Sequence, residues 1–279
     1  MIRLGEVQNL HIVKKVEFGV YLSDELGDGD RVLLPKKQVP NQVRIGDAVE
    51  VFVYRDSKDR LIATTSIPKL TLGEVARVRV AQVGKVGAFL DWGLEKDLLL
   101  PYKEQTKKVS EGEECLVALY IDKSNRLCAT MNVYPYLSVD SPHKKDDRVM
   151  GTVYEISDNF GAFVAVDDKY SGLIPKKELY GEIKIGDTIE ARVTNVKEDG
   201  KLSLSIREKA YLQIDTDAQK VMDIINSFDG VLPFTDKASP EVIKRETQMS
   251  KNEFKRAVGR LLKEGKIRIT ERAIRAADK

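Results

Sequence analysis

The stretch Phe160-Gly161-Ala162-Phe163-Val164 decides the fold, because two close variants of it occur earlier in the chain. The variants are Phe18-Gly19-Val20-Tyr21-Leu22 and Val86-Gly87-Ala88-Phe89-Leu90. Each follows a β-rich run that itself opens at a glycine. Self-similarity at a fixed period is the mark of repeated structural units. The sequence therefore predicts three tandem modules.

The landmarks after this strand also recur in one order. A short apolar strand ends in proline, and a glycine beside an acidic residue follows at the same distance in every copy: Pro35 and Gly46, Pro101 and Gly112, Pro175 and Gly186. An alternating strand, a polar turn and a last short strand complete each copy. Five strands of this length would close into a small barrel, which buries the apolar face and removes the edges. A five-stranded Greek-key barrel of this size is an OB-fold.

The glycine of the quoted stretch has a predicted geometric role. Phe160 and Phe163 have opposite parity on an ideal strand, so their rings would face opposite sides. A bulge or strong coil at Gly161 would bring both rings to one surface.

Segment 151–208 resembles the S-one RNA-binding domain, named for a ribosomal small-subunit protein, and segments 5–68 and 73–135 resemble it more loosely. The resemblance implies that RNA lies on an exposed barrel face. It further implies that two aromatic residues of the second strand stack on bases, while an Asp/Arg pair near the last strand contacts bases and backbone. The matching positions are Phe18, Tyr21, Phe89, Phe160 and Phe163 for the aromatic residues and Asp56, Arg60, Asp122 and Arg126 for the polar pairs. In the third copy Lys197 and Lys201 replace the pair, and Lys201 is the candidate contact there.

The match is partial in every copy. Val86 replaces the first aromatic residue of the second copy, and Pro35, Pro101 and Pro175 occupy the position of the family's histidine. We therefore expect weak individual sites and binding shared across tandem modules. Two alternatives stay open: the aromatic rings belong to the cores, and the Asp/Arg pairs are ion pairs within hairpins.

A different period begins beyond Tyr211. Val221, Ile224, Ile225 and Phe228 mark one face of a predicted helix. Ser239-Pro240 signals the start of a second helix. Ser250 and Glu253 fit a capping box for a third, with Met249 and Phe254 as a hydrophobic staple and Gly265 as the stop.

The third predicted helix has a buried stripe of Phe254, Val258, Leu261 and Leu262. A strand from Lys266 to Thr270 and a turn at Glu271-Arg272 follow it. Three helices followed by a two-stranded hairpin indicate a winged helix.

The face opposite the buried stripe carries cationic and polar residues, namely Asn252, Lys255, Arg256, Arg260 and Lys263. Between Ser239 and Arg275, basic residues clearly outnumber acidic ones. Such a stripe would contact phosphates or enter a groove. The alternatives are a solvated outer face or a protein-binding surface.

Three S-one-like barrels followed by this C-terminal pattern resemble the conserved virulence factor B family of bacterial proteins. The pattern includes Asp236-Lys237, Met249-Ser250-Lys251 and Gly265-Lys266-Ile267. The resemblance covers essentially the whole chain and implies a cytoplasmic RNA-binding protein that influences gene expression, including that of virulence factors. The expected fold is mainly β, with OB barrels at 1–68, 69–137 and 146–209 and an α/β winged helix at 215–279.

Composition limits the function classes. The chain has 279 residues, net charge +2, and only 2 histidines and 2 cysteines. So few His and Cys side chains are poorly suited to form a standard zinc site or to support histidine-based catalysis. We therefore expect no enzyme activity, no cofactor and no metal. No apolar run is long enough to cross a membrane. The leading hypothesis is a non-catalytic regulator that binds single-stranded RNA. The alternatives are a DNA-binding transcription regulator that uses the winged helix and an accessory subunit of an RNA-processing enzyme.

Overall fold

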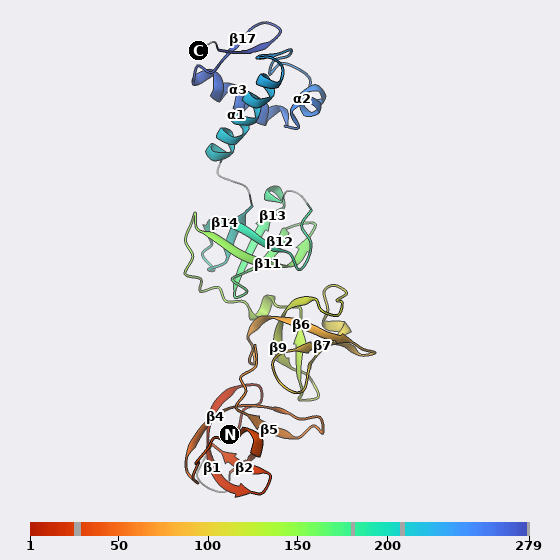
Figure 1. Ribbon diagram of the computed structural model, residues 1–279, viewed down its shortest axis with the longest axis vertical. Helices are drawn as coiled ribbons and strands as arrows, with labels where there is room; N and C mark the ends of the chain where they lie inside the picture. The colour runs from red at the N-terminus through yellow and green to blue at the C-terminus, as the bar shows by residue number, and fades with distance from the viewer. Residues whose placement is uncertain (25–28, 180–181, 207–209, 278–279) are drawn as a thin grey trace. The chain divides into compact units, whose positions relative to one another are not determined.

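The computed structural model describes residues 1–24, 29–179, 182–206 and 210–277. The chain separates into two compact units, Met1–Ile206 and Arg207–Lys279. The first unit is built from β-strands, and the second contains the three long helices α1, α2 and α3 (Figure 1). The mainly β fold that ends in an α/β domain is confirmed.

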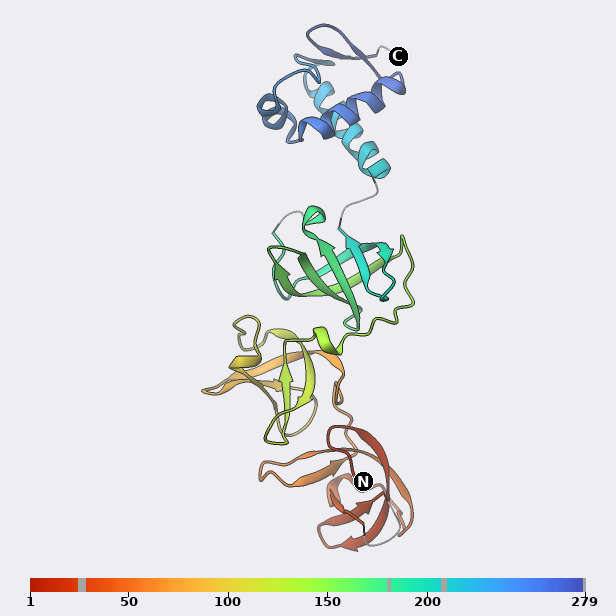
Figure 2. The ribbon, with the colours of Figure 1, turned by 180° about the vertical axis from the view of Figure 1, so that it is seen from behind.

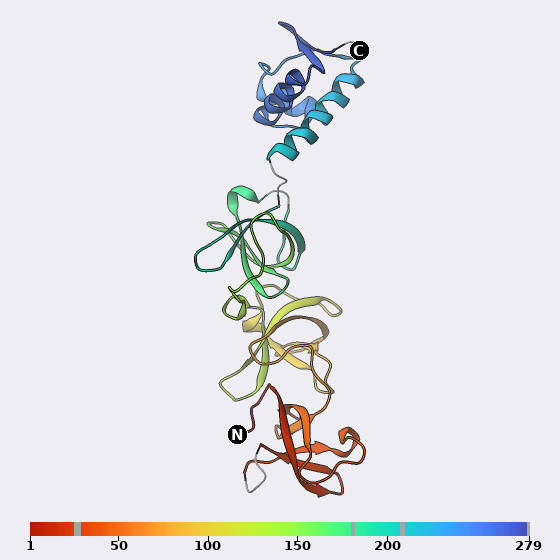
Figure 3. The same cartoon turned by 90° about the vertical axis from the view of Figure 1, so that its left-hand side faces the viewer.

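The first unit contains three five-stranded modules that repeat one topology. The first module contains β1 (Val7–Val16), β2 (Gly19–Ser23), β3 (Val32–Pro35), β4 (Ala48–Arg55) and β5 (Leu61–Thr64). The second contains β6 (Val75–Val83), β7 (Gly87–Asp91), β8 (Leu98–Pro101), β9 (Glu114–Ile121) and β10 (Leu127–Thr130). The third contains β11 (Arg148–Ser157), β12 (Gly161–Val166), β13 (Tyr170–Pro175), β14 (Thr188–Val196) and β15 (Leu202–Ser205). The first and third close as β1-β2-β3-β5-β4 and β11-β12-β13-β15-β14. The second keeps the same order as a five-stranded sheet, β10-β9-β6-β7-β8. Figure 3 shows the strands of the third barrel curving into a ring. We call the modules barrels 1, 2 and 3.

Each barrel encloses its own core because inward and outward residues alternate along its strands. In barrel 3, Val153, Val164, Ile174, Val193 and Leu204 are essentially inaccessible to solvent. The proline that ends the third strand in each barrel leads into a short 3-10 turn: η1 (Lys36–Gln38), η2 (Tyr102–Glu104) and η4 (Lys176–Glu178). The end of the third strand and the turn after it therefore occupy equivalent positions in the three barrels.

The bulge that the sequence predicts at Gly161 lies elsewhere. The register shift is on β11, between Val153 and Glu155, and equivalent shifts occur on β1 and β6. Gly161 itself has φ of +119°, and a side chain there would overlap the carbonyl oxygen of Ile174. Glycine is required because the second strand approaches the third too closely for a Cβ atom.

Adjacent barrels share apolar side chains. Phe52 on β4 of barrel 1 is fully buried, and its ring lies edge-on to Trp92 of barrel 2, with the ring centroids 5.7 Å apart. Tyr154 on β11 of barrel 3 packs in one cluster with Leu116 of β9 and with Leu137, which follows the turn η3 (Tyr134–Tyr136). The barrels of this unit therefore contact each other through built interfaces.

An arginine cross-links barrels 2 and 3. The Arg77 guanidinium on β6 donates to Asp168 Oδ2 at 2.7 Å, Thr188 Oγ1 at 2.7 Å and Thr152 Oγ1 at 2.6 Å. Thr152 also donates to the other oxygen of Asp168. One side chain of barrel 2 thus holds three polar groups of barrel 3.

The second unit is a winged helix. Its elements are α1 (Ala210–Ser227), β16 (Val231–Leu232), α2 (Pro240–Thr247), α3 (Lys251–Lys263), β17 (Ile267–Ile269) and β18 (Ile274–Ala276). Helix α3 packs across α1 (Figure 2). The wing is a three-stranded sheet, β16-β18-β17, because β16 adds a strand to the predicted hairpin.

The predicted helix signals of this domain are confirmed. Ser239 caps α2, and the capping box of Ser250 and Glu253 starts α3. One prediction of burial is wrong: Leu262 is 46% exposed. Phe228, which the sequence places on the apolar face of the first helix, lies just beyond α1 and is 40% exposed. Leu262 falls at the edge of the apolar stripe of α3, whereas Ala257 lies within the stripe and is buried. Among the described helices, none is long and apolar enough to cross a membrane.

Candidate nucleic-acid interface

Barrel 3 presents two adjacent aromatic rings. Phe160 is 62% exposed, and its ring centroid lies 6.4 Å from that of Phe163 in an edge-to-face arrangement. Phe163 is half-buried, with the Tyr154 ring behind it at 6.2 Å. The two rings are therefore neighbours, as expected, but only Phe160 is widely accessible. Its turn position before β12 and the positive φ of Gly161 produce this arrangement.

Barrel 1 repeats this pair with different chemistry. Phe18 is 58% exposed, and the Tyr21 ring stands edge-on to it at 6.5 Å. Because Phe18 and Phe160 precede equivalent glycines, their rings occupy equivalent positions. Neither Phe18 nor Phe160 belongs to a core, so the core alternative does not hold for them.

Barrel 2 lacks the first ring of the pair. Val86 is 59% exposed in its place, and Phe89 is half-buried. Tyr102 is 50% exposed, and its hydroxyl donates to the Gly84 carbonyl at 2.7 Å. It lies beside Val86, since its backbone N–H donates to the Val86 carbonyl at 3.4 Å. The sequence prediction missed Tyr102, although the other two copies have lysine after the same proline.

The Asp/Arg pairs differ between barrels 1 and 2. Arg60 donates to Asp56 Oδ2 through Nη2 at 2.7 Å and Nε at 3.0 Å, as the hairpin alternative expects. Partial desolvation of the Asp56 carboxyl works against its ionised form, but hydrogen bonds from Arg60 and Lys58 outweigh it and lower its pKa.

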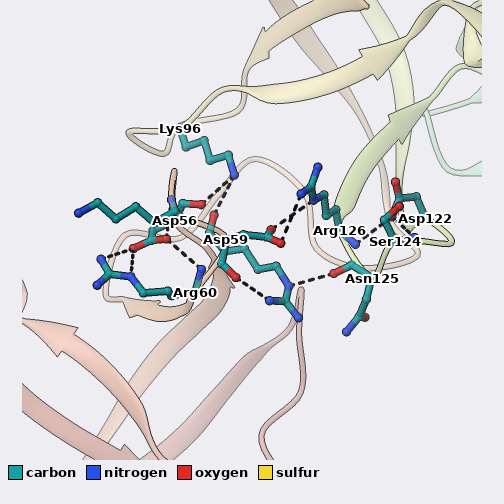
Figure 4. Close-up of polar contacts among 10 residues, drawn as sticks. Asp56, Asp59, Arg60, Lys96, Asp122, Ser124, Asn125 and Arg126 are labelled. Atoms are coloured by element: carbon teal, nitrogen blue, oxygen red, sulfur yellow. Dashed lines mark hydrogen bonds and ion pairs between the residues drawn. The ribbon is translucent and has the colours of Figure 1, made fainter.

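In barrel 2, Asp122 accepts the backbone N–H groups of Ser124 and Arg126 and so holds the turn. The Arg126 side chain instead pairs with Asp59 of barrel 1, with Nε and Oδ1 3.3 Å apart. Figure 4 shows Arg60 and Arg126 on opposite sides of Asp59.

In barrel 3, Lys201 bonds Asp199 Oδ2 at 2.8 Å. Hydrogen bonds to Asp199 and Tyr134 raise the pKa of Lys201. The Lys201 ammonium lies 5.9 Å from the Tyr134 ring centroid, and that ring is 47% exposed. Tyr134, in the segment after barrel 2, is a second aromatic residue that the repeat pattern does not reveal.

The predicted cationic face of α3 is exposed. Asn252, Lys255, Arg256, Arg260 and Lys263 all lie on the solvent side, whereas Phe254 and Val258 pack inward. Arg260 is engaged by Glu264, with Nε and Oε1 2.7 Å apart. The face therefore presents Lys255, Arg256 and Lys263 as its more available charges.

Among the described residues, the structure places no group of three or more His, Cys, Asp or Glu side chains where they could hold a metal ion. Burial raises the pKa of the Cys115 and Cys128 thiols to about 11, which disfavours the reactive thiolate at neutral pH.

Comparison with known proteins agrees with the geometry. Family models described as "S1 domain" match residues 4–66 and 72–132, and one described as "S1 RNA binding domain" matches residues 142–207. A model described as "CvfB-like winged helix domain" matches residues 219–275.

Relatives match nearly the whole length of the chain. The chain is 32% identical to YitL of Bacillus subtilis over 95% of this chain and 91% of that protein. It is 30% identical to "Conserved virulence factor B" of Staphylococcus saprophyticus over 88% of each chain. A crystal structure of a multidomain protein with nucleic acid binding domains from Streptococcus pneumoniae aligns with a TM-score of 0.50 at 26% identity, covering 98% of both chains. The chain therefore belongs to the conserved virulence factor B family, with S1 domains of the nucleic-acid-binding type and a winged helix of that family's own kind.

Proposed function

We propose that the chain binds single-stranded RNA without catalysis and acts in post-transcriptional regulation of gene expression. The observation that carries the proposal is the exposed ring of Phe160 beside Phe163, repeated by Phe18 beside Tyr21 in barrel 1. Single-stranded nucleic acids bind OB barrels mainly by stacking unpaired bases on such rings, which contributes about 1–3 kcal/mol per base.

Cationic side chains would supply the contacts to phosphates. Lys201 directly precedes β15 of barrel 3 and lies beside Tyr134, close to where the family's polar contacts lie. The exposed cations of α3 would add phosphate contacts, which strengthen binding without reading sequence. The barrels supply stacking, and the winged helix supplies charge.

Competition with duplex DNA distinguishes single-strand binding from duplex binding. Paired bases hide their faces inside the stack, so barrel aromatics gain little from a duplex. Labelled RNA of about 16 nucleotides, the upper site size of one OB-fold, is titrated with the full chain at one salt concentration. Unlabelled RNA and duplex DNA of the same sequence then compete. The proposal expects RNA to compete at least tenfold better; equal or better competition by the duplex would show that the winged helix reads DNA.

A further inference from the structure

A cavity of about 230 Å³ lies between barrels 2 and 3, and no residue that the sequence assigns to RNA binding lines it. Barrel 2 contributes Arg77 of β6 and Leu116 of β9. Barrel 3 contributes Val153 and Tyr154 of β11, together with Gly186 of the loop before β14. Both barrels therefore form walls of one cavity that is separate from the candidate nucleic-acid interface.

Much of the wall is apolar. Cys115, Leu116, Met131 and Val153 are buried, and Ile185 is half-buried. A methionine sulfur packs favourably against aromatic rings, so Met131 suits an aromatic ligand. A cavity of about 150 Å³ engineered into another protein holds benzene. By proportion, the cavity between barrels 2 and 3 holds a molecule of about nine non-hydrogen atoms.

Tyr154 brings a hydroxyl group without a partner to this wall. The residue is 4% exposed, and its hydroxyl is buried and forms no hydrogen bond within the part of the chain that the structure describes. Burial raises the pKa of Tyr154, so the hydroxyl stays protonated at neutral pH and can donate. A buried hydroxyl without a partner costs free energy. A ligand with an acceptor oxygen would supply the missing partner.

The two cationic side chains of the lining are already paired. Arg77 Nε lies 2.7 Å from Asp168 Oδ2, and Lys107 Nζ lies 2.6 Å from Glu113 Oε1. An anionic ligand would have to compete with these carboxylates, and the exposed Glu114 of the lining would repel it. A neutral ligand leaves both ion pairs intact, so the charges of the cavity favour a neutral molecule.

We propose that this cavity binds a neutral aromatic compound whose carbonyl oxygen accepts a hydrogen bond from Tyr154 and whose ring packs against Met131. The site is a small-molecule site in addition to the proposed RNA-binding surfaces, and its occupation requires no RNA. Because Met131 belongs to barrel 2 and Tyr154 to barrel 3, the bound compound holds the two barrels together.

Methyl NMR observes this site directly. The chain has five methionines, of which Met131 alone lines the cavity. The full chain, isotope-labelled at its methionine methyl groups, is titrated with benzamide, a neutral aromatic amide of the size that the cavity accepts. We expect a saturable shift of the Met131 signal with a Kd between about 10 μM and 1 mM, while the other methionine signals stay in place.

Tyr154→Phe removes only the hydroxyl group. It should weaken benzamide binding about fivefold, because one hydrogen bond is lost. It should not lower the Tm of the chain without benzamide, because the lost hydroxyl has no partner there. Tyr120→Phe is the matched control, since the Tyr120 hydroxyl is also buried but Tyr120 does not line the cavity. This control should bind benzamide as the unsubstituted chain does.

A Met131 signal that stays in place at benzamide concentrations of about 10 mM would overturn the site. Equal affinity of Tyr154→Phe and the unsubstituted chain would overturn the hydrogen bond from Tyr154. Tighter binding of benzoate than of benzamide would overturn the choice of a neutral ligand. These titrations contain no RNA, so a negative result leaves the proposed RNA-binding function standing.

Discussion

Phe160→Ala tests whether the exposed aromatic surface of barrel 3 binds bases. The ring is 62% exposed and lies 6.4 Å from the ring of Phe163. Removing a stacking ring costs about 1–3 kcal/mol of binding, so RNA affinity should fall roughly 5- to 150-fold.

Stability should change much less than binding. The lost edge-to-face pair contributes about 0.5–1.5 kcal/mol, which corresponds to a decrease in Tm of a few degrees for a domain of this size. A core phenylalanine would instead cost about 3–5 kcal/mol. The comparison of affinity with Tm therefore separates a binding ring from a structural one.

The assay measures RNA affinity by anisotropy and Tm by calorimetry on the full chain. Phe160→Leu keeps an apolar side chain but removes the π-face, so it should bind nearly as weakly as the alanine variant. Met150→Ala is the control, since Met150 is 50% exposed on β11 of the same barrel and has no ring. RNA affinity that survives Phe160→Ala would refute the stacking argument, and a collapse of the melting transition would refute the surface assignment.

Three further outcomes are expected. Replacing Lys255, Arg256 and Lys263 by Gln should lower the slope of log K against log salt concentration for RNA binding by up to about 2, at about 0.7 per phosphate contact. Arg260→Gln should lower that slope less than any one of these three replacements, because Glu264 engages Arg260. Equal effects of the four single replacements would contradict this reasoning. Arg77→Met should lower stability by about 1–2 kcal/mol, below the value for a fully buried pair because Arg77 and Asp168 are 33% and 27% exposed, and an unchanged Tm would show that the cross-link contributes nothing. Cys115 and Cys128 should resist iodoacetamide at pH 7 in the folded chain, because burial raises both thiol pKa values to about 11. The folded state therefore disfavours the reactive thiolate until the pH approaches that value. Rapid labelling at neutral pH would contradict the burial.

Local sequence patterns predicted the barrels well, because each landmark has a local cause. Gly161 is required by the approach of β12 to the Ile174 carbonyl, and the alternation of Ile189, Ala191 and Val193 follows from the period of a strand. The capping box of Ser250 and Glu253 is likewise a contact between near neighbours in sequence. The exact domain bounds and the RNA-binding roles of the site residues remain predictions.

Contacts between barrels could not be predicted in this way. Asp59 meets Arg126, and Arg77 meets Asp168, across separate modules. Nothing in the periodicity of one module specifies a partner in the next. One signal was available: Val51-Phe52-Val53-Tyr54 is a continuous apolar run, which indicates a strand buried on both faces. Phe52 and Tyr54 do face barrel 2.

The most direct test of the central claim is to cross-link the full chain to single-stranded RNA with ultraviolet light and to identify the attached residues by mass spectrometry. Stacked aromatic rings should carry the cross-links, so the account predicts them at Phe160 or Phe163 in barrel 3 and at Phe18 or Tyr21 in barrel 1. Cross-links confined to α3 of the winged helix, with none on the second strands of the barrels, would contradict it.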